Sequence, residues 1–373
     1  MKKAYIIILI AVVLILAVIL IIFFTYKGKK DSDEAAETPQ AEEQVQEIEF
    51  SANIFDPNEI KNIVPLGELN GGYDEVSTLG GVMMNIKEKI YQSSSVKVYA
   101  PTQMTLESYA FFEMPPEPPS WRLSFSIEPD LTITFDHLDE VTEKVMDATA
   151  SVPASSSAGL MPKEKITLSA GEHFANTTGT SKAHNWNIYL YDRNQQNEFL
   201  NIERLSQSEG VGKQLLTAVC PFKYYNEETK KFFIDLMGYH QAGESSDCGS
   251  VSHDVKGTVS GLWFLKEEGV ETFYEGVYAS PFSIFKNSAG SVNIYQVDHG
   301  YYEISSNSAS FKDPQEVTNE HCYNFSDAIN QNRSVSGYLY FKVISDNQMQ
   351  MSFGASGSCP ASFPAQQAKT YYR

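Results

Sequence analysis

The stretch from Val96 to Leu138 constrains the fold most, because both of its ends alternate apolar and polar residues. Val96 to Pro101 opens it and Leu131 to Leu138 closes it, with many β-branched and aromatic side chains. Such period-two alternation predicts half-buried β-strands that end at sharp turns. Between them, Met104 to Glu113 and Trp121 to Ile127 predict two further strands, so consecutive antiparallel strands are expected here.

A long apolar run near the N-terminus predicts contact with a lipid bilayer. Residues 4–24 are uncharged and almost wholly apolar, and roughly 20 helical residues match the thickness of a bilayer. A cleaved signal peptide is the alternative, but the run is longer than usual and no small-x-small cleavage site follows Phe24. We therefore expect residues 1–30 to be a short cytoplasmic lead and a transmembrane signal anchor.

An acidic segment separates this anchor from the rest of the chain. Between Asp31 and Glu49 every charged residue is Asp or Glu, and apolar residues are few. Such a segment cannot bury enough surface to fold, so residues 31–52 are expected to be an extended, disordered linker. The whole chain has a formal net charge of −19, which should repel a phosphate backbone, so nucleic-acid binding is not expected.

More than 300 residues follow the linker, and their length and composition predict two domains. Residues 53–215 are expected to form the antiparallel β domain opened above. Residues 216–373 are expected to form a second β domain, a sandwich or a barrel, because short strands recur there about every ten residues between turns. Within it, residues 226–238 predict one amphipathic helix with Asn226 as its N-cap.

The four cysteines help to predict in which cellular compartment the C-terminal part lies. Their even number and wide spacing fit disulfides better than a zinc site, whose ligand pairs are closely spaced. Of the three possible pairings, sequence proximity favours Cys220 with Cys248 and Cys322 with Cys359. Reduced thiols would instead indicate the cytoplasm. Similar numbers of lysines flank both ends of the anchor, so flanking charge does not set its orientation. Because the cysteines favour disulfides, we expect a single-pass protein with an extracytoplasmic C-terminal part.

The strand pattern of the first domain resembles the lysostaphin-type zinc endopeptidases, which have the duplicated hybrid motif fold. The resemblance covers about a third of the chain and is carried by Val98 to Pro101, Trp121 to Ile127, Phe135-Asp136-His137-Leu138, a short helix from about Asp139 to Ala148, Ile166 to Glu172, and the strand Asn185 to Asp192. The order of motifs after residue 216 is also similar to prokaryotic proteins that append a β domain to a degenerate domain of this type.

This resemblance implies a particular zinc site. In the family, a His and an Asp four residues apart and the second His of a His-x-His pair hold the metal. The first His of that pair and the His of the aromatic-x-His-Leu motif polarise the attacking water. Side chains two apart on a strand project from the same face, and catalytic zinc uses three protein ligands plus water.

This sequence departs from that pattern on the last strand. Trp186 and Ile188 occupy the apolar positions, so the two family histidines are replaced by Asn185 and Asn187. A neutral amide is a poor zinc ligand. We therefore expect no metal site, no cofactor and no peptidase activity from these positions.

The other family positions are also incomplete. Residues 72–79 contain no histidine, and the carboxylates there are Asp74 and Glu75. His137 alone matches a catalytic position and is the single candidate catalytic residue. A rearranged zinc set remains an open alternative, and its members would be His137, His173, His184 and Asp74.

Two functions from different classes remain open. The first is a membrane-anchored, non-catalytic protein that binds or scaffolds an envelope glycan, peptide or protein through the exposed polar face of the last strand, formed by Asn185, Asn187, Tyr189 and Tyr191 with His137 nearby. The second is a zinc-dependent cell-envelope endopeptidase or hydrolase that uses the rearranged ligand set, with zinc as its cofactor.

Overall fold

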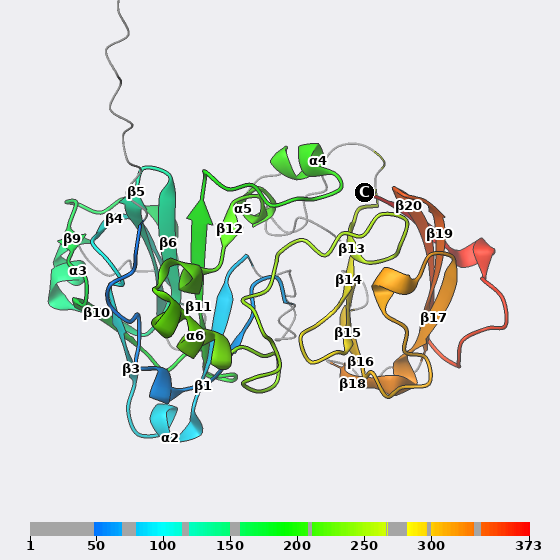
Figure 1. Ribbon diagram of the computed structural model, residues 1–373, viewed down its shortest axis with the longest axis horizontal. Coiled ribbons are helices and arrows are strands. Elements are labelled where there is room, and N and C mark those ends of the chain that lie inside the picture. The colour runs from blue at the N-terminus through cyan, green and yellow to red at the C-terminus, as the bar shows by residue number, and fades with distance from the viewer. Residues whose placement is uncertain are drawn as a thin grey trace, which may run out of the picture. The chain divides into compact units, whose positions relative to one another are not determined.

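The computed structural model describes residues 48–68, 80–113, 119–149, 157–207, 211–265, 267, 282–296, 300–331 and 337–373 (Figure 1). These residues fold mainly into antiparallel β-sheets, as predicted. The predicted anchor at residues 4–24, most of the acidic linker, and Asp74 and Glu75 lie outside the described residues. No helix among the described residues has both the length and the apolar character needed to cross a bilayer.

A large antiparallel sheet forms the centre of the first half. Its strands are β1 (Ile60–Val64), β2 (Val82–Ile86), β4 (Met104–Phe112), β5 (Ser120–Glu128), β6 (Leu131–Leu138), β8 (Ser157–Leu160), β9 (Thr167–Leu168), β11 (Asn185–Asp192) and β12 (Ala218–Val219). The strand order is β1-β2-β11-β6-β5-β4-β8, with β12 paired to β11 and β9 paired to β4. The strands predicted at residues 131–138 and 185–192 have the bounds of β6 and β11.

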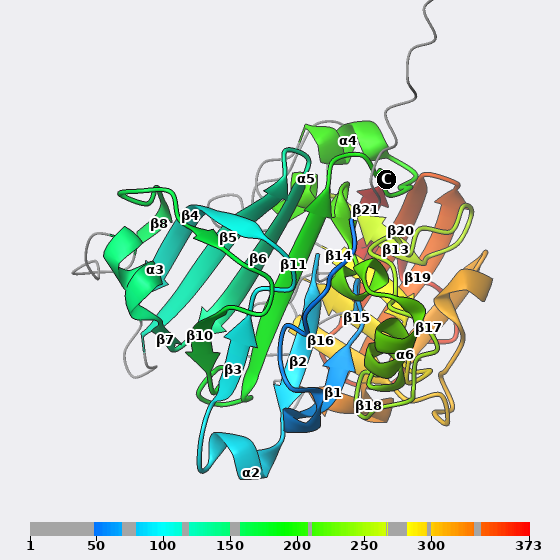
Figure 2. The same cartoon turned by 60° about the vertical axis from the view of Figure 1, so that its left-hand side comes forward.

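A small sheet packs on one face of the large sheet. It consists of β3 (Val96–Tyr99), β7 (Glu140–Val141) and β10 (His173–Thr177) in the order β3-β10-β7. Figure 2 shows β3 and β10 in front of the large sheet. Phe174 of β10 lies 5.3 Å from Phe125 and 5.0 Å from Phe135, measured between ring centroids. The apolar side of the strand alternation is therefore buried between the two sheets.

Short helices and turns connect these strands. The α-helices are α2 (Glu88–Tyr91), α3 (Glu143–Ala148), α4 (Ile202–Ser206), α5 (Val211–Leu215) and α6 (Glu227–Asp235), and the 3-10 helices are η1 (Pro57–Glu59), η2 (Pro221–Tyr224), η3 (Pro314–Glu316), η4 (Phe325–Asp327) and η5 (Ala365–Gln367). The predicted cap of α6 is present, because the side chain of Asn226 accepts a hydrogen bond from the Thr229 N–H at 3.0 Å. Phe233 of this helix is fully buried, whereas Phe232 is 48% exposed.

The segment around α6 belongs to the core of the first half rather than to the second β domain. Phe222, Phe233 and Met237 are fully buried in the hydrophobic cluster that the large and small sheets share. Buried residues of the second cluster begin at Val259. Helix α6, expected in the second β domain, therefore packs in the first core, because a β-strand pattern in the sequence does not show which core an intervening helix joins.

Two antiparallel sheets enclose the second cluster and form a β-sandwich. One contains β13 (Gly261–Trp263), β14 (Phe282–Lys286), β15 (Val292–Gln296), β16 (Gly300–Ile304) and β18 (Ala328–Gln331), and the other contains β17 (Glu320–Asn324), β19 (Tyr338–Ser345), β20 (Gln348–Gly354) and β21 (Lys369–Tyr372). Both sheets contribute buried side chains to this cluster, for example Ile294 from the first and Phe341 from the second. Of the two predicted alternatives, a sandwich and a barrel, the described strands form the sandwich.

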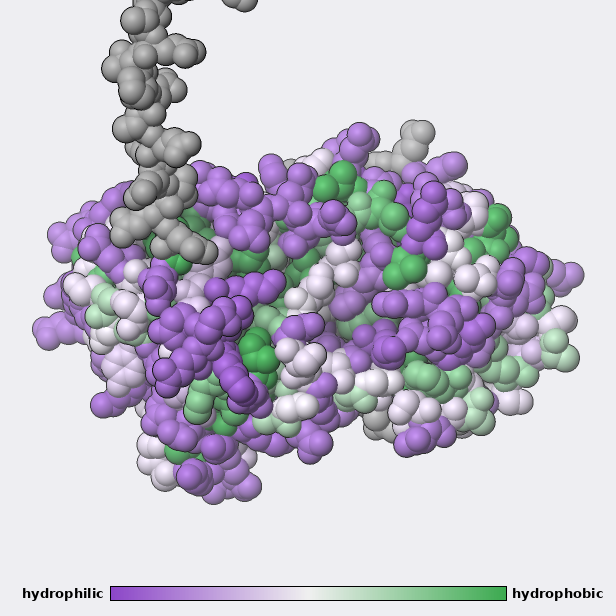
Figure 3. All heavy atoms as spheres, viewed as in Figure 1, coloured by the Kyte–Doolittle hydropathy of each residue, from purple (hydrophilic) through white to green (hydrophobic). Residues whose placement is uncertain are grey.

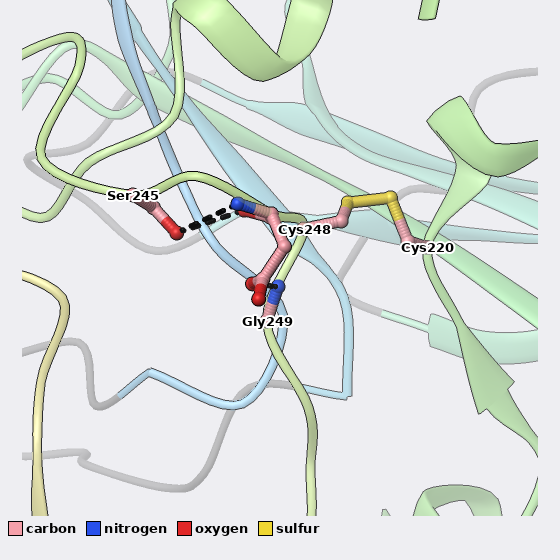
Figure 4. The surroundings of a disulfide bond; sticks show 5 residues. Cys220, Ser245, Cys248 and Gly249 are labelled. Carbon is pink, nitrogen blue, oxygen red and sulfur yellow. Dashed lines mark hydrogen bonds between the residues drawn. A yellow bond between two sulfur atoms is a disulfide. The ribbon is translucent and has the colours of Figure 1, made fainter.

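The cysteines form the two disulfides predicted from sequence proximity. Cys220 pairs with Cys248 across 28 residues, and Cys322 pairs with Cys359 across 37 residues. Figure 4 shows the first bond, with Ser245 and Gly249 beside Cys248. The carbonyl of Cys248 accepts a hydrogen bond from the Leu66 N–H at 2.9 Å. The first disulfide therefore connects the segment before α6 to a loop that is hydrogen-bonded to the chain just after β1.

Candidate functional site

The face of the large sheet opposite the small sheet carries the polar residues of β11 that the sequence predicted as a binding site. Trp186, Ile188 and Leu190 are fully buried in the first core. Asn187 and Tyr189 therefore lie on the opposite face, because neighbouring residues of a strand project to opposite sides. In the strand register Asn187 lies across from Asp136 of β6 on one side and from Met83 of β2 on the other. Four residues from three strands thus meet on this face.

The two asparagines are buried, which differs from the exposed face expected from the sequence. Asn185 and Asn187 are each 7% exposed. The side-chain oxygen of Asn185 accepts a hydrogen bond from the Thr180 hydroxyl at 2.9 Å. The amide nitrogen of Asn187 donates to the Tyr189 hydroxyl at 3.2 Å. Asn187 lies where β11 has a partner strand on each side, and Asn185 pairs with β2. Alternation alone does not show whether the outer face of a central strand is covered.

One oxygen on this face lacks a partner. The Oδ1 atom of Asn187 is buried and accepts no hydrogen bond from the described residues. A buried acceptor without a donor costs roughly 1–3 kcal/mol of stability. Such a cost is offset when a ligand or an ordered water supplies the donor, so this atom marks a position where a hydroxyl or an amide could bind.

An ion pair lies beside the asparagine. The guanidinium of Arg122 donates through both Nε, at 2.9 Å, and Nη2 to Oδ2 of Asp136. Asp136 is buried, whereas the Arg122 side chain is 45% exposed. Burial by itself lowers the pKa of Arg122, but the charge of Asp136 and these hydrogen bonds outweigh it and raise the pKa. Arg122 therefore keeps its positive charge, and part of its side chain reaches solvent while it bonds to the buried Asp136.

A bulge in β6 produces the unusual backbone of His137. Leu123 pairs with Phe135 and Trp121 pairs with Leu138, so Arg122 alone faces two residues of β6. His137 has a φ of 62°, and its N–H donates to Oδ1 of Asp136 at 2.9 Å. The candidate catalytic histidine is thus placed next to the ion pair and is only partly buried.

Tyr189 and Tyr191 add two aromatic rings to the same face. Their ring centroids lie 6.4 Å apart, and their planes differ by 14°. The Tyr191 hydroxyl donates to the side-chain oxygen of Gln214 at 3.2 Å. Burial, helped by the nearby charge of Asp136, raises the pKa of Tyr189 well above its ordinary value, and burial does the same for Tyr191. Both phenols are therefore neutral hydrogen-bonding groups at physiological pH.

The histidines of the rearranged zinc set have separate surroundings. The ring of His184 stacks on Tyr91 with centroids 3.6 Å apart. The Nε2 atom of His173 lies 3.0 Å from Oδ1 of Asn176 in the small sheet. Within the described ranges, no three His, Cys, Asp or Glu side chains are grouped as a metal ion would require. Asp74, the fourth member, lies outside the described residues.

Three residues of this face, Met83, Arg122 and Asp136, were not identified as site residues from the sequence. Arg122 could have been found, because it is the basic residue of an alternating strand whose neighbours Trp121 and Leu123 are apolar. Met83 could not, since only the pairing of β2 with β11 places it across from Asn187. We call the group formed by Met83, Arg122, Asp136, Asn187, Tyr189 and Tyr191 the β11 face.

Comparison of the chain with protein-family models, with curated proteins and with solved structures finds no match in any of the three.

Proposed function

We propose that this chain is a membrane-anchored, extracytoplasmic protein whose β11 face binds an uncharged glycan of the cell envelope without catalysing a reaction. The apolar run at residues 4–24 supports the anchor. Two disulfides support the compartment, because such bonds persist in oxidising environments and are rare in the cytosol. The resemblance to lysostaphin-type enzymes, which act on envelope polymers, supports the class of ligand.

The side chains at the positions where that family binds its metal support the proposal that this chain does not catalyse a reaction. The family's metal-binding His on the last strand corresponds to the amide Asn187, and the residue across from it on β2 is Met83. Residues 72–79, where the resemblance would place a His and an Asp four apart, contain no histidine. A neutral amide is not an effective zinc ligand.

The chemistry of the β11 face favours a neutral ligand. The charges of Arg122 and Asp136 balance each other, and Tyr189 and Tyr191 are uncharged. The formal net charge of −19 works against a polyanion. Aromatic rings beside planar amide and guanidinium groups suit sugar rings, whose apolar faces stack and whose hydroxyls donate and accept hydrogen bonds. The single observation that carries the proposal is the buried, unpartnered Oδ1 of Asn187 within this group.

Among the described residues, exposed apolar side chains that could bind a protein partner are few. Figure 3 shows mostly hydrophilic residues on the face that it displays. The large apolar side chains that are exposed among the described residues come from four separate parts of the chain: Met161, Leu200, Phe232 and Ile344. Protein-binding surfaces usually gather such residues into one patch, so a glycan is favoured over a protein partner.

Binding measurements on the full-length protein in detergent micelles test this proposal. Neutral envelope oligosaccharides, acidic oligosaccharides and peptides would be immobilised separately and compared as ligands. We expect binding to a neutral oligosaccharide, weakened about tenfold or more by Tyr191→Ala or Arg122→Ala. Phe232→Ala, which removes an exposed aromatic ring of α6, is the matched control and should bind like the wild type.

Two results would overturn the proposal in distinct ways. Selective binding of peptides, or equal losses in Tyr191→Ala and Phe232→Ala, would exclude a glycan site on the β11 face. Stoichiometric zinc in the purified protein, with hydrolysis of an envelope polymer that is lost in His137→Ala, would instead favour the zinc hydrolase. Unfolding midpoints of all variants would show whether any loss of binding follows from loss of the fold.

A further inference from the structure

The five-stranded sheet of the sandwich buries polar groups on the face opposite its hydrophobic cluster. Tyr302 and Ile304 of β16 belong to that cluster, whereas Tyr301 and Glu303 lie on the other face, and both are buried. Asn293 of β15 shares this second face and is fully buried as well. Because a strand normally exposes one face, a buried carboxylate here needs a specific reason.

Two glutamates from distant parts of the chain are held close together on this face. The Ser288 N–H donates to Oε1 of Glu68 at 2.8 Å. The adjacent residue, Asn287, donates through its side chain to Oε1 of Glu303 at 3.4 Å. Glu68 follows β1 and Glu303 lies in β16, yet both carboxylates are bonded to consecutive residues of one turn. Consecutive Cα atoms are about 3.8 Å apart, so the two carboxylates are neighbours.

Each of these carboxylates keeps one oxygen without a partner. Glu68 is 6% exposed and Glu303 is 0% exposed. The Oε2 atoms of both are buried and accept no hydrogen bond from the described residues. The Ser288 hydroxyl interacts with the Glu68 carboxyl and, together with the Ser288 N–H, works to lower the pKa of Glu68. Two buried carboxylate oxygens without a donor among the described residues therefore belong to glutamates that are bonded to consecutive residues of one turn.

Little positive charge compensates these carboxylates. Nε2 of His240, a residue whose side chain is 46% exposed, lies 2.7 Å from Oε1 of Glu303. No ion pair between described residues involves Glu68. Burial raises the pKa of Glu68 to about 7, and the charges of Glu303 and Glu244 add to this shift. Buried anionic groups are costly unless they are paired or bind a metal.

The two phenols beside the glutamates are already engaged. The hydroxyls of Tyr239 and Tyr301 lie 2.6 Å apart, and the Tyr301 hydroxyl donates to Oδ1 of Asn293 at 3.0 Å. Neither hydroxyl is therefore free to satisfy the glutamate oxygens. A cation bound from solution would supply compensating positive charge at these oxygens.

We propose that Glu68 and Glu303 bind one divalent cation of the Ca²⁺ type through their unpartnered oxygens. Ca²⁺ takes oxygen ligands from carboxylates, carbonyls, hydroxyls and water in variable geometry. The Ser288 hydroxyl offers a third oxygen, and water would complete the shell. The ion would connect the segment after β1 to the sandwich, because its two carboxylates come from these two parts. This site is independent of the ligand proposed for the β11 face.

Terbium luminescence and thermal unfolding test the cation site on the full-length protein in detergent after treatment with EDTA. Terbium replaces calcium, and its emission should be sensitised by excitation of Tyr239 and Tyr301. An affinity in the millimolar to sub-millimolar range is typical of extracellular calcium modules with few charged ligands. At about ten times the dissociation constant, Ca²⁺ should raise the unfolding midpoint by about 3 °C.

Isosteric variants connect this effect to the two glutamates. Glu68→Gln and Glu303→Gln should each weaken cation binding about tenfold or more, because each removes one anionic ligand. Glu128→Gln, at an exposed end of β5, is the control and should bind terbium and Ca²⁺ like the wild type. The comparison of Ca²⁺ with EDTA on the wild-type protein remains decisive where a variant does not fold.

Three outcomes would overturn the cation site. The first is no terbium emission and no shift of the midpoint at about 10 mM Ca²⁺, roughly ten times the largest dissociation constant expected. The second is binding that both glutamine variants leave unchanged. The third is an unfolding midpoint that does not change with Ca²⁺ but falls as the pH rises through 7, together with loss of this pH dependence in Glu68→Gln. That third result would show that the two carboxylates share a proton instead of a metal ion.

Discussion

Acidification from pH 7 to pH 5 should destabilise the folded protein through His253. Its ring stacks on Phe285 with centroids 3.8 Å apart and planes 4° apart, and its Nε2 lies 2.9 Å from the carbonyl oxygen of Gly67. That bond makes Nε2 the protonated nitrogen of the neutral ring. Burial lowers the pKa of His253 to about 4, although the hydrogen bond to Gly67 works in the other direction.

The sign and the size follow from proton linkage. The unfolded chain has an ordinary histidine pKa of about 6.5, so between pH 6.5 and pH 4 it binds more protons than the folded chain. The contribution of His253 to stability is therefore complete above the unfolded pKa and is lost as the pH falls. With these two pKa values, the free energy of unfolding should decrease by about 2 kcal/mol between pH 7 and pH 5.

Urea unfolding at pH 7, 6 and 5 measures this change, and His253→Gln serves as the reference because its side chain does not titrate. The variant loses the ring stacking and should be less stable at every pH, so only the difference in slope is informative. The wild type should lose about 2 kcal/mol more than the variant from pH 7 to pH 5. Equal slopes, or an NMR titration of the folded His253 ring with a midpoint near 6.5, would refute this reasoning.

Two further changes should reduce the stability of the folded protein, one in the first core and one at the start of β13. Replacing Cys220 and Cys248 together by alanine opens a loop of 28 residues and should cost about 3–4 kcal/mol in urea unfolding under oxidising conditions; a midpoint equal to that of the wild type after reduction-free purification would contradict this. Gly261→Ala should cost on the order of 3 kcal/mol, because Gly261 has a φ of +125° and an added Cβ would lie 2.0 Å from Oδ1 of Asp254. Gly290→Ala, at a φ of +81° with no atom within 4 Å of the added Cβ, is the matched control, and a loss as large as that of Gly261→Ala would exclude the steric cause.

The strands of the first half could be predicted because their alternation is strict. In β6 the apolar residues Leu131, Ile133 and Phe135 are buried against the small sheet, so the period of two reports directly on burial. The same reasoning applies to β11. The N-cap of α6 at Asn226 could also be predicted, because an asparagine followed by acidic residues favours a helix start through local hydrogen bonds.

Strand alternation does not predict burial where both faces of a sheet are covered. Glu303 alternates with Tyr302 and Ile304 as a surface residue of a half-buried strand would, yet it is fully buried. Its cover comes from the loop that contains Tyr239 and His240, more than 60 residues earlier in the sequence. The position of helix α6 was not predictable for a related reason, because the helix lies between two strand patterns and only packing assigns it to the first core.

By itself, the sequence determined the β class, the bounds of β6 and β11, the cap of α6 and the pairing of the cysteines, because alternation, capping and short loop closure act over neighbouring residues. Only the tertiary structure decided that Asn187 is buried beside Arg122 and Asp136, and that Glu68 meets Glu303. These are contacts between segments far apart in the chain. Their formation depends on which faces of the sheets are covered, and no local pattern specifies that.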